Sequence, residues 1–348
     1  MLKNAEVTIS YTPVHLNLNS IKLNPVNIVL LIKGRKIFRS FFIHFYFSLY
    51  FRGVLFYNYV MDKICSLCPN ACKVDRDISA GACGVDGKIK IAKYYLHKFE
   101  EPVICDGNGS GTIFFCGCSL KCVFCQNFEV SRAMRGKEIS VQELADIFKE
   151  LENMGAQNVN LVNPTHYADK IIKAFEIYKP KIPVVYNTHG YEKIDALEKI
   201  DRYIDVYLPD LKYYSPAVSK RYSKKENYFE VASRALEFMA KKPLKFDENG
   251  NMISGVIVRH LVLPQNVNDS KKVLEWFAKS PLCNVHYINV MSQYTPFGDI
   301  DAYPELKRKL TAREYDRVLD YAISLGIEKM FYQKIESADT IYIPKWDF

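Results

Sequence analysis

Four cysteines lie within ten positions of one another in the segment FFCGCSLKCVFCQN, residues 114–127. Three of them, Cys118, Cys122 and Cys125, have the spacing C-x3-C-x2-C, and Cys116 precedes them. Thiolates are the usual protein ligands of iron–sulfur clusters, and they also bind zinc. Three cysteines on a cubane would hold three irons and leave the fourth iron open to a substrate. Cys116 as a fourth ligand would instead close the cluster, as electron transfer requires.

A second group of cysteines precedes the first, in the segments CSLCPNAC and GACG. It consists of Cys65, Cys68, Cys72 and Cys83, with the spacing C-x2-C-x3-C-x10-C. Four thiolates suffice for a closed structural zinc site, and a second iron–sulfur cluster is the other interpretation. The nearby glycines and proline suit a small irregular module that a metal would hold together.

The distribution of cysteines favours metal binding over disulfides. Nine of the ten cysteines lie between Cys65 and Cys125. Short-spaced clusters in a chain of 348 residues indicate metal ligands in a reducing cytoplasm, whereas disulfide frameworks are typical of small secreted chains. Cys105 and Cys283 are isolated, and we expect them to be structural.

Net charge and composition separate residues 1–60 from the rest. Seven basic residues and one acidic residue in this segment account for +6 of the formal charge of +8, which leaves +2 for residues 61–348. A nearly neutral body carries no basic footprint, so nucleic acid is not an expected partner. The aromatic segment 37–60 is interrupted by charged residues and falls short of the ~20 apolar residues of a membrane span.

Three interpretations of residues 1–60 follow: an interfacial anchor, an ordered extension of the fold, or upstream sequence translated in error. The change in composition favours the last, with Met61 as the working start. We therefore predict a non-native or disordered extension at 1–60, a Cys-rich metal-binding module at 61–105 and a barrel domain at 106–348. No membrane association is expected.

Repeated strand–loop–helix units are predicted from residue 111 onward. Near-continuous apolar runs of this kind are typical of a parallel sheet that is covered on both faces. The predicted strands are 111–115, 158–162, 182–186, 203–208, 255–264 and 285–291. Six units predict an α/β protein with a partial (βα)6 barrel, whose chemistry lies at the carboxyl ends of the strands. A doubly wound open sheet is the alternative, although no G-x-G-x-x-G follows a strand.

The cysteine loop after the first predicted strand resembles that of radical S-adenosylmethionine (SAM) enzymes. Over roughly residues 62–348 the chain is similar to pyruvate formate-lyase activating enzymes. It is most similar to a branch whose members are assigned this activity only by their similarity to the others. The resemblance implies that Cys118, Cys122 and Cys125 bind a [4Fe–4S] cluster and that SAM chelates the open iron. Cys116 is then a bystander. The reduced cluster would cleave SAM to methionine and a 5′-deoxyadenosyl radical, which abstracts a hydrogen atom from the substrate.

The resemblance also assigns SAM contacts near the cluster. Phe124, between the last two cysteines, would lie near the adenine. The Gly-Gly-Glu segment that often binds the SAM amino group is replaced here by NPTH, residues 163–166. Asn163 and Thr165 would supply neutral acceptors in its place, and His166 could approach the site.

Three later strand ends complete the predicted SAM site. Asn187 stands where the family's Asp-Thr-Asn-Gly loop has its carboxylate, and Asp210 matches an acidic position that helps to hold a monovalent cation. Arg259 matches a strand arginine that contacts SAM, and a charged side chain in an apolar strand is costly unless it is paired. Three further residues at strand ends are candidates to face the substrate: Lys212, Gln293 and Tyr294.

These features favour an enzyme, a radical SAM oxidoreductase of the cytoplasm. Activation of a glycyl-radical enzyme is the activity that the resemblance implies, with a flavodoxin or ferredoxin-like protein as electron donor. Another radical modification is open to the same chemistry. The alternative from a different class is a non-catalytic iron–sulfur electron-transfer or zinc-binding protein.

Overall fold

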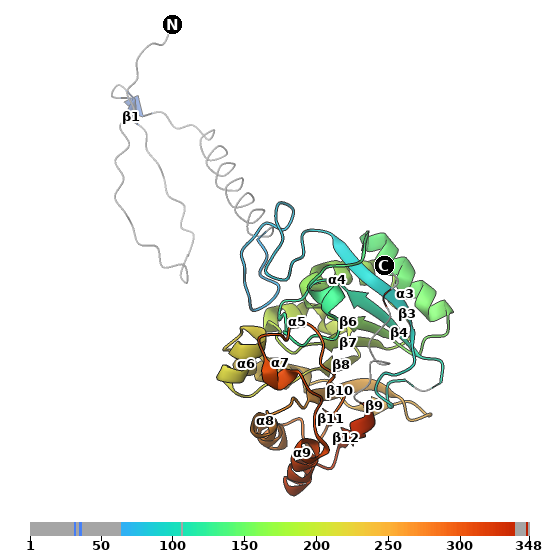
Figure 1. Ribbon diagram of the computed structural model, residues 1–348. Coiled ribbons are helices and arrows are strands. Elements are labelled where there is room, and N and C mark those ends of the chain that lie inside the picture. Colours follow the sequence, from blue (N-terminus) through green and yellow to red (C-terminus); the bar gives the residue numbers. More distant parts are fainter. Residues whose placement is uncertain (1–30, 33–34, 37–63, 106, 338–345, 347–348) are drawn as a thin grey trace. The chain divides into compact units, whose positions relative to one another are not determined.

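The computed structural model describes residues 31–32, 35–36, 64–105, 107–337 and 346 (Figure 1). The chain divides into two compact units, Met1–Tyr59 and Val60–Phe348. In the first unit, the described residues form an antiparallel pair of strands, β1 (Leu31–Ile32) and β2 (Arg35–Lys36). The predictions for the segment 37–60 and for Met61 lie outside the described residues. None of the helices in the described part of the chain is long and apolar enough to cross a membrane.

A ten-stranded sheet organises the second unit, in the order β12-β11-β10-β8-β7-β6-β4-β3-β5, with β9 paired to β10. The strands are β3 (Ile89–His97), β4 (Ser110–Phe115), β5 (Lys137–Ile139), β6 (Val159–Val162), β7 (Val184–Thr188), β8 (Val206–Pro209), β9 (Lys245–Phe246), β10 (Met252–Leu261), β11 (Tyr287–Met291) and β12 (Met330–Tyr332). Strands β4, β6, β7, β8, β10, β11 and β12 are parallel. The predicted α/β class is confirmed, and β12 adds a seventh parallel strand to the six predicted.

The other strands pair antiparallel to this parallel series. β3 pairs with both β4 and β5, and β9 pairs with β10. β3 lies within the segment 61–105, so part of the predicted Cys-rich module contributes to the main sheet. The sheet order runs from β12 to β5 as an open path.

Helices follow most of the parallel strands and cover the sheet (Figure 1). They are α2 (Phe128–Ser131), α3 (Val141–Asn153), α4 (Ala168–Ile177), α5 (Ile194–Ile200), α6 (Pro216–Ser223), α7 (Tyr228–Met239), α8 (Val267–Lys279) and α9 (Ala312–Ser324). Short 3-10 turns are η1 (Thr165–Tyr167), η2 (Asp201–Tyr203), η3 (Pro304–Leu306) and η4 (Ile335–Ser337). A capping box begins α3: Ser140 Oγ accepts from the Glu143 N–H at 3.1 Å, and Glu143 Oε2 accepts from the Ser140 N–H at 2.7 Å.

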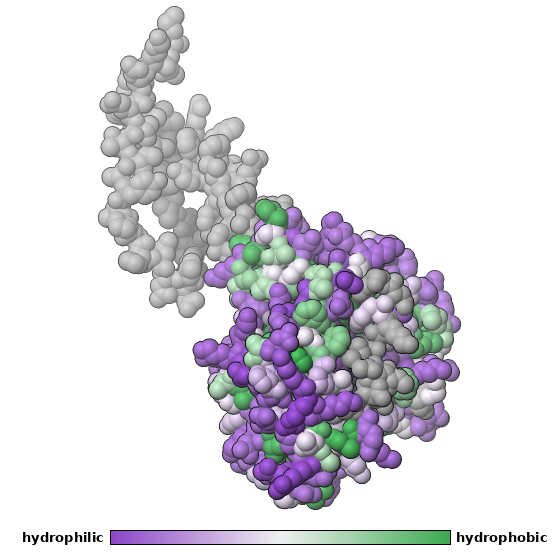
Figure 2. Space-filling model, viewed as in Figure 1, coloured by the Kyte–Doolittle hydropathy of each residue, from purple (hydrophilic) through white to green (hydrophobic). Residues whose placement is uncertain are grey.

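The core lies between the sheet and its helices. Every residue of β4, β7 and β8 is buried, as expected for strands covered on both faces. The visible outer surface of this unit is mainly polar, with small apolar groups between the charged ones (Figure 2). Burial of these strands fixes the positions at which their carboxyl ends emerge, and the candidate site is built there.

Candidate functional site

A cavity of about 820 Å³ lies at the carboxyl ends of the parallel strands. Residues at the end of β4, β6, β7, β8, β10, β11 and β12 all contribute to its lining. Ligand pockets typically have volumes of about 300–1,000 Å³, so the volume of this cavity lies within the range that holds drug-sized ligands. In parallel α/β sheets this edge is the usual location of binding sites.

Cys118, Cys122 and Cys125 line the cavity together, on the loop that joins β4 to α2. Each sulfur accepts a hydrogen bond. The Leu120 N–H donates to Cys118 Sγ at 3.4 Å. Ser223 Oγ donates to Cys122 Sγ at 3.1 Å, and Ser131 Oγ donates to Cys125 Sγ at 3.3 Å. Donors directed at sulfur stabilise a thiolate, which is the form that binds metal.

The chemistry of these thiols fits iron ligation. All ten cysteines of the chain are free. Burial raises the pKa of Cys118 to about 12, and negative charge on Cys122 and Cys125 adds to the rise. Bound iron would remove this penalty, because a coordinating thiol loses its proton. Within the described residues, no three ligand-type side chains converge on one metal ion; the thiolates of a cubane bind separate irons and require no such convergence.

Cys116 is separated from these three cysteines. It is fully buried, and its thiol donates to the Arg135 carbonyl at 3.1 Å. Its side chain does not contribute to the cavity lining formed by the described residues. The geometry therefore matches the expectation that Cys116 packs at a strand end.

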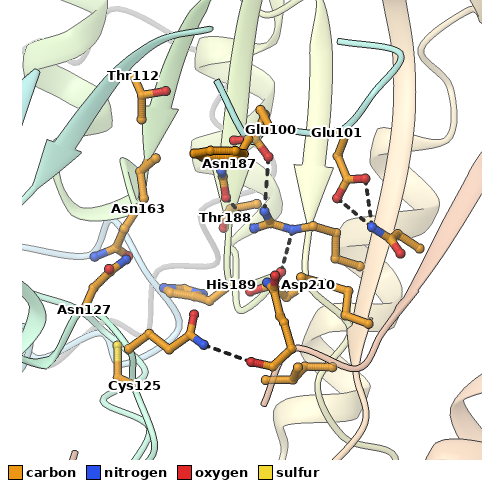
Figure 3. A pocket seen from close by; sticks show the side chains of 18 of the residues that line it. Glu100, Glu101, Thr112, Cys125, Asn127, Asn163, Asn187, Thr188, His189 and Asp210 are labelled. Atoms are coloured by element: carbon orange, nitrogen blue, oxygen red, sulfur yellow. Dashed lines mark hydrogen bonds and ion pairs between the residues drawn. The ribbon is translucent and has the colours of Figure 1, made fainter. Parts of the chain in front are cut away.

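Asp210 and Arg259 form the centre of a charged network in the cavity (Figure 3). Arg259 Nε donates to Asp210 Oδ1 at 2.9 Å, and Arg259 NH2 donates to Asn187 Oδ1 at 2.6 Å. Lys212 Nζ donates to the second oxygen, Asp210 Oδ2, at 2.6 Å. Burial alone would raise the pKa of Asp210, but the Arg259 and Lys212 charges hold it below its ordinary value. Asp210 is therefore a carboxylate at neutral pH.

Phe124 and Asn163, two of the predicted SAM contacts, also line the cavity. Three tyrosine rings surround the Phe124 ring edge-on, with centroids 6.1–6.4 Å away: Tyr213, Tyr222 and Tyr294. Asn163 adopts a left-handed backbone conformation with φ of 61°. Its Nδ2 donates to the Gly117 carbonyl, while its Oδ1 is buried without a hydrogen-bond partner in the described structure. An unpaired buried acceptor is costly, so Asn163 is prepared to accept from a ligand.

Thr165 does not reach the cavity lining formed by the described residues. It lies in η1, where its hydroxyl donates to Glu192 Oε1 at 2.5 Å. Pro164 begins this tight turn and directs Thr165 into the interior. His166 is buried in the same turn, with Nε2 2.7 Å from the Cys116 carbonyl oxygen. Burial lowers the pKa of His166 to about 4, so its imidazole is neutral.

Two of the three residues predicted to face the substrate line the cavity, and the third does not. Lys212 and Gln293 line the cavity, whereas the Tyr294 hydroxyl donates to the Leu306 carbonyl at 2.6 Å inside the core. Two acidic residues that we did not predict, Glu100 and Glu101, line the cavity from the loop between β3 and β4. The sequence could have placed the FEEP segment, which contains both residues, at the cavity only if β3 had been predicted.

Members of the second cysteine group lie near one another, but within the described residues no three of them are placed to hold a single metal ion. A side chain added at Gly81 would lie 3.2 Å from Cys72 Sγ and 3.5 Å from Cys83 Sγ. Burial raises the pKa of Cys68 to about 11, and negative charge on Cys83 and Cys65 raises it further.

This group is hydrogen-bonded directly to the cluster loop. The Cys118 N–H donates to the Cys83 carbonyl at 3.1 Å, and Asn70 Nδ2 donates to the Ser119 carbonyl at 2.8 Å. Gly117 fits against the same segment with φ of +82°; a Cβ there would lie 2.4 Å from Val85 Cγ2. The two cysteine groups are therefore parts of one structural assembly.

A family model and two known proteins are similar to this chain. The Radical SAM superfamily model matches residues 112–277, which include the cluster loop, Asn187, Asp210 and Arg259. A relative in Methanocaldococcus jannaschii, the uncharacterized protein MJ0674, is 33% identical over 282 residues, which cover 77% of each chain. A solved domain of a pyruvate-formate lyase-activating enzyme from Bacteroides vulgatus is 14% identical, covers 56% of this chain and 91% of that domain, and has a TM-score of 0.34. That last similarity is too low to support a conclusion.

Proposed function

Because this chain belongs to the radical SAM superfamily, we propose that it binds a [4Fe–4S] cluster through Cys118, Cys122 and Cys125 and cleaves SAM reductively. The observation that carries the proposal is the position of these three thiols in one cavity with the Asp210–Arg259 network. The bound cluster would supply one electron to the SAM sulfonium, which yields methionine and a 5′-deoxyadenosyl radical.

The side chains of the cavity would hold and orient SAM. Asn163 offers a buried acceptor for the amino group or a ribose hydroxyl, and Phe124 offers an aromatic surface for the adenine. Arg259 and Lys212 already provide both oxygens of Asp210 with cationic donors. This pairing supports a network held by side chains, in which no monovalent cation is needed beside Asp210.

The resemblance of the cysteine loop supports a finer proposal, that the substrate is a glycyl-radical enzyme and that a flavodoxin or ferredoxin-like protein supplies the electron. A glycyl-radical signal in electron paramagnetic resonance, formed in a co-purified partner, would test it. Radical modification of another substrate is the competing proposal within the same chemistry.

We also propose that Cys65, Cys68, Cys72 and Cys83 form a second metal site, of zinc or of an iron–sulfur cluster. The position of Cys72 and Cys83 beside Gly81 and the hydrogen bond from the Cys118 N–H to the Cys83 carbonyl support it. Metal analysis of a folded Cys118/Cys122/Cys125 triple alanine variant tests this site alone. That variant should retain zinc or iron; a metal-free, folded variant would rule the second site out.

The function itself is tested by product analysis under anaerobic conditions. The reconstituted protein, given dithionite and SAM, should form 5′-deoxyadenosine, and the triple alanine variant should form none. Cys283→Ala is the control, because Cys283 is a free cysteine that does not line the cavity and should be dispensable. A wild-type protein that holds its cluster but leaves SAM intact would favour the alternative, a non-catalytic electron-transfer protein.

A further inference from the structure

Glu101 lies on the side of the cavity away from Cys125 (Figure 3), and it forms a buried polar pair with Asn289. Asn289 Nδ2 donates to both carboxyl oxygens of Glu101, at 3.0 and 2.8 Å. Glu101 is 6% exposed and Asn289 is 4% exposed. Asn289 lies on β11 in register with Arg259 on one side and Phe331 on the other, and all three residues line the cavity.

Glu101 forms no ion pair with a basic residue in the described part of the chain, and the Arg259 charge acts on it only from beyond ion-pair distance. Arg259 and Lys212 both bind Asp210, and Arg259 NH1 lies 3.7 Å from Glu100 Oε1. Lys98, the remaining lysine of the lining, is exposed to solvent. In the described part of the chain, no basic nitrogen lies within ion-pair distance of the Glu101 carboxylate.

A carboxylate in this position is costly, because burial penalises the charged form and a neutral amide compensates for it only in part. Burial accordingly raises the pKa of Glu101 to about 7. Asn289 carries a second unmet requirement: its Oδ1 is buried without a hydrogen-bond partner in the described structure. One ligand group would satisfy both residues, namely a cation that carries several N–H donors.

We propose that Glu101 and Asn289 are the substrate-recognition pair of this cavity and that they bind an alkylammonium or guanidinium group of the substrate. The proposal rests on the proposed function and adds the chemical class of the molecule that shares the cavity with SAM. Met291, Met330 and Phe331 line the cavity beside the pair and would contact the alkyl part of the substrate. The cation would donate to Glu101 and to Asn289 Oδ1.

The experiment measures binding directly, by saturation-transfer nuclear magnetic resonance on the reconstituted full chain. The probes are n-butylguanidinium, n-butylammonium and the neutral isostere n-butylurea, each at millimolar concentration with SAM present and absent. We expect both cations to bind the wild type and n-butylurea to bind at least about tenfold more weakly, as expected when a charged hydrogen bond is lost. This comparison needs no variant, so a folding defect cannot obscure it.

Variants then locate the site. Glu101→Gln keeps the shape of the side chain and should weaken cation binding about tenfold or more, and Asn289→Ala should weaken it as well. Glu138→Gln is the matched control, because Glu138 pairs with Lys88 at an exposed position and should leave binding unchanged. Equal binding of n-butylurea and the cations, or unchanged binding by Glu101→Gln, would overturn the proposal.

Adding SAM to the binding experiment distinguishes the proposed cation site from the proposed SAM-cleaving function. Displacement of the probes by SAM would place the SAM amino group at Glu101 and overturn the assignment to substrate. Cation binding that tolerates SAM supports it. If the wild type binds the cations but forms no 5′-deoxyadenosine, the proposed function fails while the cation site stands; if it cleaves SAM without preferring cations, only the present inference fails.

Discussion

Asp210 and Arg259 are joined across neighbouring strands, with Arg259 Nε 2.9 Å from Asp210 Oδ1 at the carboxyl ends of β10 and β8. Their side chains are only 19% and 15% exposed. Lys212 and Asn187 complete the network from adjacent strand ends. This arrangement fixes the middle of the cavity, and breaking it should disturb both stability and SAM binding.

Replacing Asp210 with asparagine tests the network. The change leaves Arg259 and Lys212 partly buried without the carboxylate they share, so the free energy of unfolding should fall by roughly 3 kcal/mol. Urea denaturation measures the loss. Glu138→Gln removes one partner of an exposed ion pair and should cost less than about 1 kcal/mol. Equal effects of the two substitutions would contradict the structural role of the network.

Gly117 tests the contact between the two cysteine groups. Alanine there would suffer the strain of φ +82° and would place its Cβ 2.4 Å from Val85 Cγ2 and 3.0 Å from the Cys83 carbonyl oxygen. Gly250→Ala is a matched control, because φ is +85° and an added Cβ meets nothing within 4 Å. We expect a loss of about 1–2 kcal/mol in the control from backbone strain alone and a larger loss at Gly117. Gly117→Ala should also lower the iron content of the reconstituted protein, and equal stability and iron content in both variants would argue against a tight contact.

Glu192 predicts a pH dependence. It is 2% exposed and accepts hydrogen bonds from Thr165 and Thr188, and burial raises its pKa to about 7. In the unfolded chain the carboxyl pKa is about 4.3, so the folded state retains the proton longer and wild-type stability falls as pH rises from about 4.3 through 7. The glutamine side chain of Glu192→Gln does not ionise, so it adds no such pH dependence to stability.

The stability of Glu192→Gln relative to the wild type should therefore rise by roughly 3 kcal/mol between pH 4 and pH 8. Urea denaturation at several pH values provides the comparison, with Glu138→Gln as the exposed control. A difference that stays constant with pH would mean that Glu192 ionises normally in the folded protein, and one that falls would mean that its pKa is lowered; either result would contradict the prediction.

The strands and the cluster loop could be predicted because their signals are local. Continuous apolar runs mark buried parallel strands, and C-x3-C-x2-C is read directly from the sequence. β12 has only three residues, and Thr165 turns inward after Pro164, so neither outcome was evident from local pattern. The Glu101–Asn289 pair joins residues 188 positions apart, and no periodicity or motif brings such residues together before the fold is known.

The central claim is that three cysteines hold the cluster and leave an iron for SAM, and the Cys116→Ala and Cys122→Ala variants test it most directly. Cys122 lines the cavity, whereas Cys116 donates to the Arg135 carbonyl in the core. Electron paramagnetic resonance of the reduced cluster, with and without SAM, is the measurement. We predict that SAM changes the signal of the wild type and of Cys116→Ala and that Cys122→Ala has lost the signal. Loss of the cluster in Cys116→Ala as complete as in Cys122→Ala would mean that four thiolates saturate the irons, and would contradict SAM binding at the cluster.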